Sequence, residues 1–74
     1  MINELDRVAL TEAVPEHDLR PGDVGTVVLV HQEGKGFTIE FMTLMGTTIA
    51  VVTLPANAVR PLRAREVANA REVA

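Results

Sequence analysis

The stretch RPGDVGTVVLVHQEGKGFTIEF, residues 20–41, contains two apolar runs separated by a charged connector that carries two glycines. β-Branched and aromatic side chains dominate both runs, as is typical of β-strands. In the second run every other residue is apolar, so we expect Phe37, Ile39 and Phe41 to point into a core. Gly25, inside the first run, indicates a bulge or a close contact where strands cross. The glycines of the connector suit a hairpin turn, which predicts antiparallel strands over residues 23–32 and 37–43.

Shorter strand-like runs lie on either side of this pair. Pro21 and Gly22 break the chain before it and Gly46 turns the chain after it, while Pro55 opens a single helical turn. Pro61 confines the last run to a sheet edge or a strand end, because proline has no N–H to donate. Five short strands at near-regular spacing indicate a small barrel or sandwich. The three additional strands are expected over residues 5–12, 48–54 and 59–62.

Length and composition restrict the class of protein. A chain of 74 residues forms one domain of marginal stability. Cysteine is absent, which leaves self-association or a partner protein as the expected source of further burial. The formal net charge is −3, and no run is long and apolar enough to span a membrane. The N-terminus lacks a positive leader with an apolar core, so we expect a cytoplasmic protein complete from Met1.

The C-terminal residues RAREVANAREVA are rich in helix formers. A helix here would be weakly amphipathic, since its apolar side chains gather on one side of a helical wheel. A helix this short is marginal on its own in water, so we expect it to be either docked or frayed. The residues on the apolar side are Val67, Ala70, Val73 and Ala74.

The order of the expected elements resembles the SH3-like barrel, and LPANAVRPL is similar to the single turn between the last two strands of that fold. RPGDVGTVV resembles the glycine-centred segment of KOW-type barrels in translation and transcription proteins. It is also similar to the opening of barrel domains in nitrile hydratase β subunits and photosystem accessory subunits. LDRVALTEAVPEHDLRPGDVGTVV and FMTLMGTTIAVVTLPANAVRPL resemble a family of short bacterial proteins of unknown function. The resemblance implies an all-β fold, a five-stranded SH3-like barrel over residues 1–63 with a helical tail over residues 64–74, and implies little about function.

Catalysis is not expected. The sequence contains neither serine nor cysteine as a nucleophile, and its two imidazoles, His17 and His31, lie apart. A barrel of this size has no room for a deep pocket. We therefore expect no enzymatic activity, no cofactor and no small-molecule substrate.

The N-terminal third of the chain is acidic. Its carboxylates suggest either a site for a metal or a cationic partner, or a solvated loop face. The spacing Asp-x-Asp-x-Asp of calcium loops is missing, which favours the solvated face and predicts no bound metal. The residues concerned are Glu4, Asp6, Glu12, Glu16 and Asp18.

Nucleic-acid binding is an alternative function, because a KOW-type barrel can place a loop on RNA. The acidic net charge argues against it. Phe37 and Phe41 are the only aromatic residues, and core positions would prevent them from stacking on bases. The residues available for a local basic patch are Arg20, Lys35, Arg60 and Arg63.

Two of the expected strands are apolar on both faces, which is more than a half-buried strand needs. One face fills the core, so the other must be covered by the tail, by a second copy or by another protein. We therefore expect a protein-interaction or accessory module that forms a homo-oligomer or binds a partner protein. An RNA- or ribosome-associated barrel and an antitoxin-like member of a two-gene pair remain as alternatives. The candidate interface residues are Val28, Val30, Ile49, Val51, Val67, Ala70 and Val73.

Overall fold

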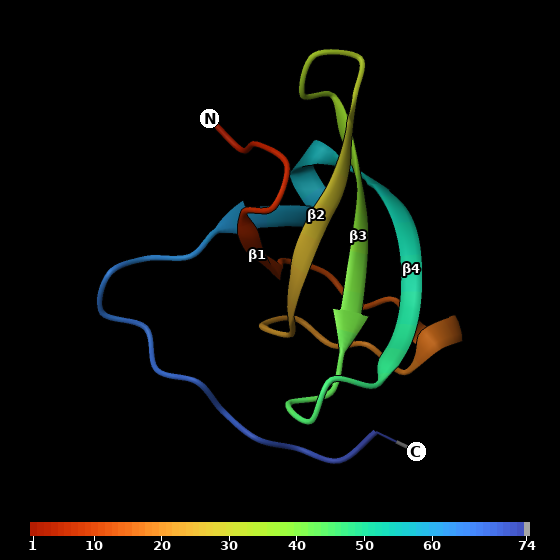
Figure 1. Ribbon diagram of the computed structural model, residues 1–74, viewed down its shortest axis with the longest axis vertical. Coiled ribbons are helices and arrows are strands. Elements are labelled where there is room, and N and C mark those ends of the chain that lie inside the picture. Colours follow the sequence, from red (N-terminus) through yellow and green to blue (C-terminus); the bar gives the residue numbers. More distant parts are fainter. Residues whose placement is uncertain (74) are drawn as a thin grey trace.

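Five antiparallel strands form one curved sheet in the computed structural model, which describes residues 1–73 (Figure 1). The strand order is β4-β3-β2-β1-β5, so β4 and β5 are the edges of the sheet. The expected all-β fold with five strands is confirmed. The elements are β1 (Arg7–Leu10), the 3-10 turn η1 (Pro15–His17), β2 (Val24–His31), β3 (Gly36–Met42), β4 (Thr48–Pro55), the 3-10 turn η2 (Ala56–Ala58) and β5 (Val59–Pro61).

The core lies on the concave face of the sheet and is centred on β3. Phe37, Ile39 and Phe41 are 3%, 0% and 2% exposed, which confirms the expected inward face. Ile39 pairs with Val27 of β2 on one side and with Val52 of β4 on the other. The alternation of β3 therefore places the centre of the apolar core, as period-two patterning requires.

Gly25 is buried where β2 crosses over the core, opposite Val8 of β1. A Cβ atom at this position would lie 2.8 and 2.9 Å from atoms of the Phe41 ring, and closer still to the γ-methyl group of Ile39. Carbon atoms in normal contact are about 3.5–4.0 Å apart. Only glycine fits here, which confirms the close contact expected from the sequence.

Two β-bulges change the direction of side chains in β2 and β4. The register between β2 and β3 shifts at Val28, so Leu29 faces outward and Val30 packs against the core. A second shift lies at Ile49, between β3 and β4. A bulge adds one residue to one strand and bends it. Because of the first bulge, Val30 lies on the core side of the sheet and not on the outer side where the sequence analysis placed it.

The sheet does not close into a barrel. Within residues 1–73, β4 pairs with β3 alone and β5 pairs with β1 alone. β5 is three residues long and ends at Pro61, which has no N–H to continue a ladder. The expected edge or end position of Pro61 is confirmed, whereas closure of the expected barrel is not found.

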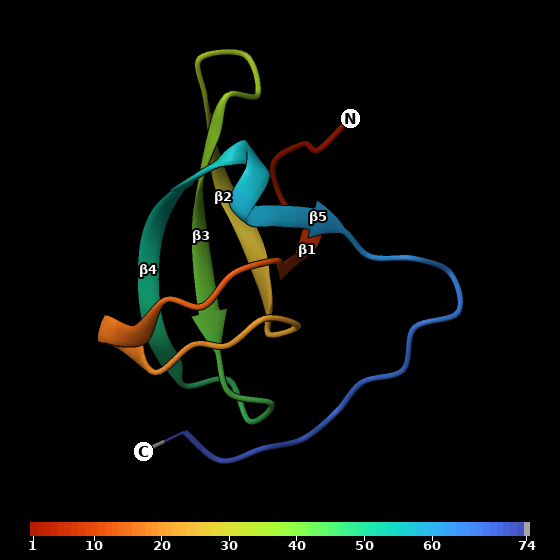
Figure 2. The ribbon, with the colours of Figure 1, turned by 180° about the vertical axis from the view of Figure 1, so that it is seen from behind.

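The predicted C-terminal helix is wrong for the residues that the structure describes. Residues 62–73 swing away from β5 and return at the end of the sheet where the β1–β2 loop lies (Figure 2). We call this segment the strap. Glu66 is tied to β5 and Arg71 to the β1–β2 loop, and an extended chain reaches about twice as far per residue as a helix. Ala74, the last residue of the predicted helix, lies outside the described residues.

Candidate interaction surface

One part of the chain carries no charge. Residues 41–59 contain no Asp, Glu, Lys, Arg or His, although 23% of the chain consists of charged residues. The segment forms the end of β3, the β3–β4 turn, all of β4, η2 and the first residue of β5. The predicted interface did not include this uncharged segment, although the distribution of charge along the sequence shows it.

Apolar side chains are exposed on the β3–β4 hairpin within this segment. Leu44 and Met45 in the turn are 82% and 93% exposed, and Val51 on β4 is 57% exposed. Met42 at the end of β3 is also exposed. We call these four residues the hairpin patch. Val51 is the only one of the four among the predicted interface residues, because that prediction rested on strands with two apolar faces and not on turns.

The apolar turn does not depend on its apolar side chains for its shape. Thr43 N–H donates to Thr47 O at 2.7 Å, and Gly46 N–H donates to Thr43 O at 2.9 Å. Gly46 has a φ of 94°, a value that glycine adopts without strain. Hairpin turns usually carry Asn, Asp or Gly. The backbone hydrogen bonds of the turn thus involve Thr43, Gly46 and Thr47, while the side chains of Leu44 and Met45 are exposed.

The free edge of β4 presents unpaired backbone groups. Ala56 N–H donates to Lys35 O at 3.0 Å, in the register of the β3–β4 ladder. Bonded and non-bonded pairs alternate along an antiparallel ladder, so the amide and carbonyl groups of Val51 and Thr53 point away from β3. The Thr38 and Thr53 hydroxyls lie 2.8 Å apart, as expected for side chains of a non-bonded pair. Within residues 1–73, no other strand pairs with this edge.

The outer face of the sheet beside this edge is polar. The Thr38 hydroxyl lies 2.6 Å from His31 Nε2, and the Thr48 hydroxyl donates to Glu40 Oε2 at 2.7 Å. An imidazole beside a hydroxyl is the pairing that an activated nucleophile needs. Here the Thr38 hydroxyl also hydrogen-bonds the Thr53 hydroxyl. His31 and Thr38 lie on a face of the sheet and line neither of the two hollows beside Met1 and Ile2. His17, the other imidazole, is exposed on η1.

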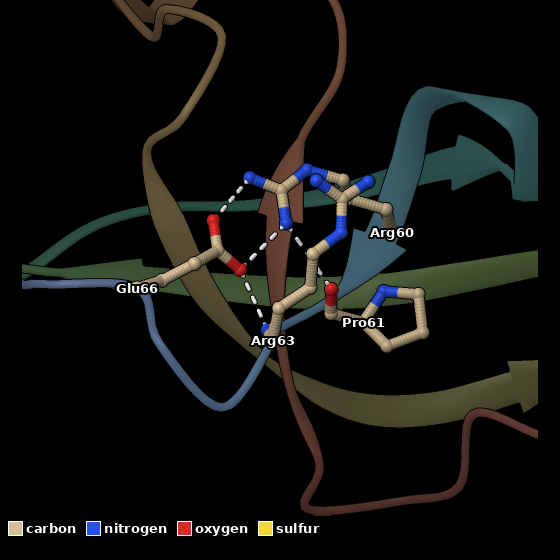
Figure 3. A network of polar contacts seen from close by, with 4 residues as sticks. All are labelled: Arg60, Pro61, Arg63 and Glu66. Carbon is tan, nitrogen blue, oxygen red and sulfur yellow. Dashed lines mark hydrogen bonds and ion pairs between the residues drawn. The ribbon is translucent and has the colours of Figure 1, made fainter.

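The candidate basic residues do not form one patch. Arg20 precedes β2 and Lys35 follows it, so the two lie at opposite ends of a strand about 27 Å long. Arg60 binds Glu66 with both terminal nitrogens, at 2.8 and 2.6 Å, and Arg63 N–H donates to the same carboxylate at 2.6 Å (Figure 3). These hydrogen bonds lower the pKa of Glu66 to about 2. Glu66 therefore neutralises the basic charge of Arg60.

The acidic residues of the N-terminal third are spread along the surface. Glu4, Asp6, Glu12 and Glu16 are exposed, while Asp18 is half-buried. Among the described residues, no three His, Asp or Glu side chains come together as a metal site would require.

A second carboxylate holds the far end of the strap. Arg71 Nε donates to Asp23 Oδ1 at 3.0 Å, and Arg71 Nη2 donates to Asp23 Oδ2 and, at 2.8 Å, to Asp18 O. Asp23 also accepts the Arg20 N–H at 2.8 Å. Burial raises the pKa of Asp23, but the hydrogen bonds from Arg71 and Arg20 outweigh it and hold this pKa below its usual value. At neutral pH the strap is therefore fixed to the β1–β2 loop by a full ion pair.

Replacing Arg71 with glutamine should free the end of the strap and leave most of the stability of the sheet, because this partly buried ion pair joins the strap to the β1–β2 loop and not one strand to another. Acid should act in the same way. The pKa values of Asp23 and Glu66 are lowered in the folded state, so their stabilising effect is complete above the usual values of 3.8 and 4.5. It is lost as the pH falls through the lowered values.

NMR order parameters of the backbone amides in residues 67–73 measure this release. They should fall in Arg71→Gln at neutral pH, and in the unaltered protein only in acid. Arg65→Gln is the matched control, since Arg65 is an exposed residue of the same strap. A strap that stays equally ordered in Arg71→Gln would show that this ion pair does not fix it.

The remaining candidate interface residues are scattered. Val28 and Ile49 are half-buried at the two bulges. Val67 is 90% exposed and Ala70 is exposed, so neither covers the sheet; Val73 is half-buried. Neither Val67 nor Ala70 of the tail therefore packs on β2 or β4. Whether the seven residues meet a partner stays a prediction.

Comparison with known proteins places the chain in a family. A search of curated proteins found no match, and a search of solved structures found none. No helix within residues 1–73 is long and apolar enough to cross a membrane. Residues 4–61, which include all five strands and both 3-10 turns, match the family described as Domain of unknown function (DUF4926). The expected membership of a family of unknown function is confirmed, and the chain belongs to the DUF4926 family.

Proposed function

We propose that this chain is a non-enzymatic protein-interaction module that binds through the hairpin patch and the free edge of β4. The exposure of Leu44 and Met45 at the tip of an uncharged hairpin carries the proposal. Exposed apolar groups that cluster mark interaction sites. The cores of protein interfaces are poor in charge and rich in methionine. Methionine side chains also adapt to differently shaped partners because they are flexible and polarisable.

We further propose that the fold is of the SH3-like type. The sheet order β4-β3-β2-β1-β5 supports this assignment. So does the 3-10 turn η2 between the last two strands. In this arrangement β4 is an edge strand, so one side of the β3–β4 hairpin is free to contact a partner.

The two alternative functions have different support. For RNA binding, Phe37 and Phe41 are buried and hence unable to stack on bases, and the basic residues are dispersed. No observation favours it over protein binding. An antitoxin-like role is a special case of the proposed module, in which the bound protein is the toxin of the pair.

Charging the hairpin tip tests the proposal. The double variant Leu44→Asp/Met45→Asp should still fold, because substitutions at exposed positions change stability by about 0.5 kcal/mol or less. Binding to protein should be lost, because an unpaired carboxylate is strongly disfavoured in an apolar interface. Tagged wild-type and variant chains are compared by affinity capture from the native cell, with the oligomeric state of each measured in parallel.

The control is Val67→Asp, which adds a carboxylate at an equally exposed apolar position on the strap. A stoichiometric protein, or a second copy of the chain, should be retained by wild type and by the control but not by the hairpin variant. Equal retention by all three chains would refute the hairpin patch as the binding site. A wild-type chain that binds neither itself nor another protein would refute the proposed function.

A further inference from the structure

We propose that the free edge of β4 pairs with β4 of a second copy of this chain, antiparallel about a two-fold axis at Val52. The inference rests on the proposed function and names the partner. Val51 of one copy pairs with Thr53 of the other, and the symmetry repeats this pair. The result is one continuous sheet that runs through both copies.

The hydrogen-bonding groups of the edge are complementary to themselves. Val51 and Thr53 each direct one N–H and one C=O away from β3, as the β3–β4 register requires. In an antiparallel pair, Val51 of one copy and Thr53 of the other each donate an N–H to the carbonyl oxygen of the other residue. The two-fold axis repeats these two hydrogen bonds between Thr53 of the first copy and Val51 of the second. Pro55 cannot donate, so the ladder ends there. The bulge at Ile49 ends the regular part of the strand on the other side.

β4 lacks the protection that edge strands usually have. Natural sheets block free edges with charged side chains, especially lysine, with proline inside the strand, or by covering them. β4 is eight residues long and uncharged, and its proline is its last residue. Val51 and Thr53 are exposed along it. An edge of this kind is open to strand addition.

Charge selects a second copy over an unrelated segment. An isologous contact brings identical surfaces together, so any charge on it would face the same charge. Each copy has a net charge of −3, yet residues 41–59 carry none. This hairpin is therefore the surface on which two copies meet with the least repulsion. A partner selected by charge complementarity would need charged residues that the edge does not have.

The same pairing covers exposed apolar groups. Val51 lies on the outer face beside the axis, where it packs against Thr53 of the partner. Antiparallel pairing about Val52 also brings the turn of each hairpin beside η2 of the other copy, a segment of alanine and asparagine that follows Pro55. Leu44 and Met45 would then lie beside the half-buried Ala56 and the exposed Asn57 of the other copy and lose part of their exposure to water.

Charge at Val51 tests the geometry. We expect wild type to have twice the 8.0 kDa mass of the chain in analytical ultracentrifugation. Val51→Lys should weaken the dimer several-fold, because the two lysines would lie diagonally across the two-fold axis on one face of the sheet, within reach of each other's charge. Leu29→Lys is the matched control: Leu29 is 50% exposed on the same face, but lies on the inner strand β2.

A charge-reversal mixture separates self-pairing from other causes. Val51→Glu alone should weaken the dimer as Val51→Lys does, whereas an equimolar mixture of the two variants should restore a dimer. In wild type, amide exchange at Val51 and Thr53 should slow as protein concentration rises, although the β3–β4 register gives neither amide an acceptor within residues 1–73 of the same copy. This second measurement needs no variant and so does not depend on the folding of any.

Each contrary result has a distinct meaning. A wild-type monomer at millimolar concentration would overturn the self-pairing. So would a dimer that Val51→Lys leaves intact, or one that Leu29→Lys dissociates equally. If the hairpin tip still captures a different protein, the proposed function survives and only the identity of the partner is wrong.

Discussion

Replacing Phe41 with alanine should lower the free energy of unfolding by about 3–5 kcal/mol, the usual range for a buried phenylalanine. The ring is 2% exposed and packs beneath Gly25 of β2, so its removal leaves a cavity in the centre of the core. A domain of this size has little stability to spare. The variant should therefore be largely unfolded at room temperature.

Urea denaturation followed by circular dichroism measures this loss, since the chain has no Trp or Tyr for fluorescence. Met42→Ala is the control, because Met42 is the next residue of β3 and is exposed on the opposite face. A loss below about 1 kcal/mol for Phe41→Ala, far from the range for buried rings, would mean that β3 faces the other way.

Gly25→Ala should also be strongly destabilising, at about 1–3 kcal/mol or more, because it forces a methyl group into a filled core. The methyl group would overlap Ile39 and the Phe41 ring, and neither is a mobile end of an exposed side chain. Gly36→Ala, with its Cβ 3.2 Å from Leu54 O, makes the same change at a looser contact and should cost less.

The two losses at Gly25 and Phe41 should not add. Residues in direct contact are energetically coupled. In a chain that already has alanine at position 41, the cavity accepts part of the new methyl group, so Gly25→Ala should cost less there than in wild type. Additive losses in the four-variant cycle would show that the overlap with Phe41 is not the cause.

The sequence predicts most of the sheet because its strands carry period-two patterns between clear breaks. Phe37, Ile39 and Phe41 alternate with polar residues, and that alternation alone places the core face of β3. The edge position of β5 follows from Pro61. Gly25 is recognisable because a glycine inside a strand usually marks a close contact.

The apolar pattern does not predict the two β-bulges. Residues 27–30 read Val-Val-Leu-Val, and a run without polar residues does not reveal where one residue is added. The shift at Val28 exchanges the faces of every residue that follows it in β2. The sequence analysis therefore placed Val30 on the outer side, while Leu29 is the residue that faces outward.

The path of the strap could not be predicted from the sequence for a different reason. Its composition favours a helix, but local propensity is weak in so short a segment. Contacts distant in the sequence decide its path: Arg71 reaches Asp23, and Glu66 reaches Arg60. Nothing in the repeat AREVA identifies these partners.

Part of the candidate interaction surface can be predicted from the sequence. The absence of charge between residues 41 and 59 is visible in the sequence, and so is the apolar turn Leu44–Met45. That β4 is an edge strand depends on the order of strands in the sheet, which no local pattern contains. The alternation of its outward backbone groups depends in turn on the register with β3.

The uncharged hairpin also fixes how the molecule responds to ionic strength. Two copies that each carry a net charge of −3 repel one another, and dissolved ions screen this repulsion without weakening an uncharged edge. In the proposed dimer, added salt should thus favour association through β4, the opposite of its effect on a protein held to RNA by phosphate contacts. Salt has the opposite effect on the strap, since screening weakens the ion pair of Arg71 with Asp23. A rise in ionic strength should therefore loosen one end of the chain and, in the proposed dimer, strengthen the contact between the two copies.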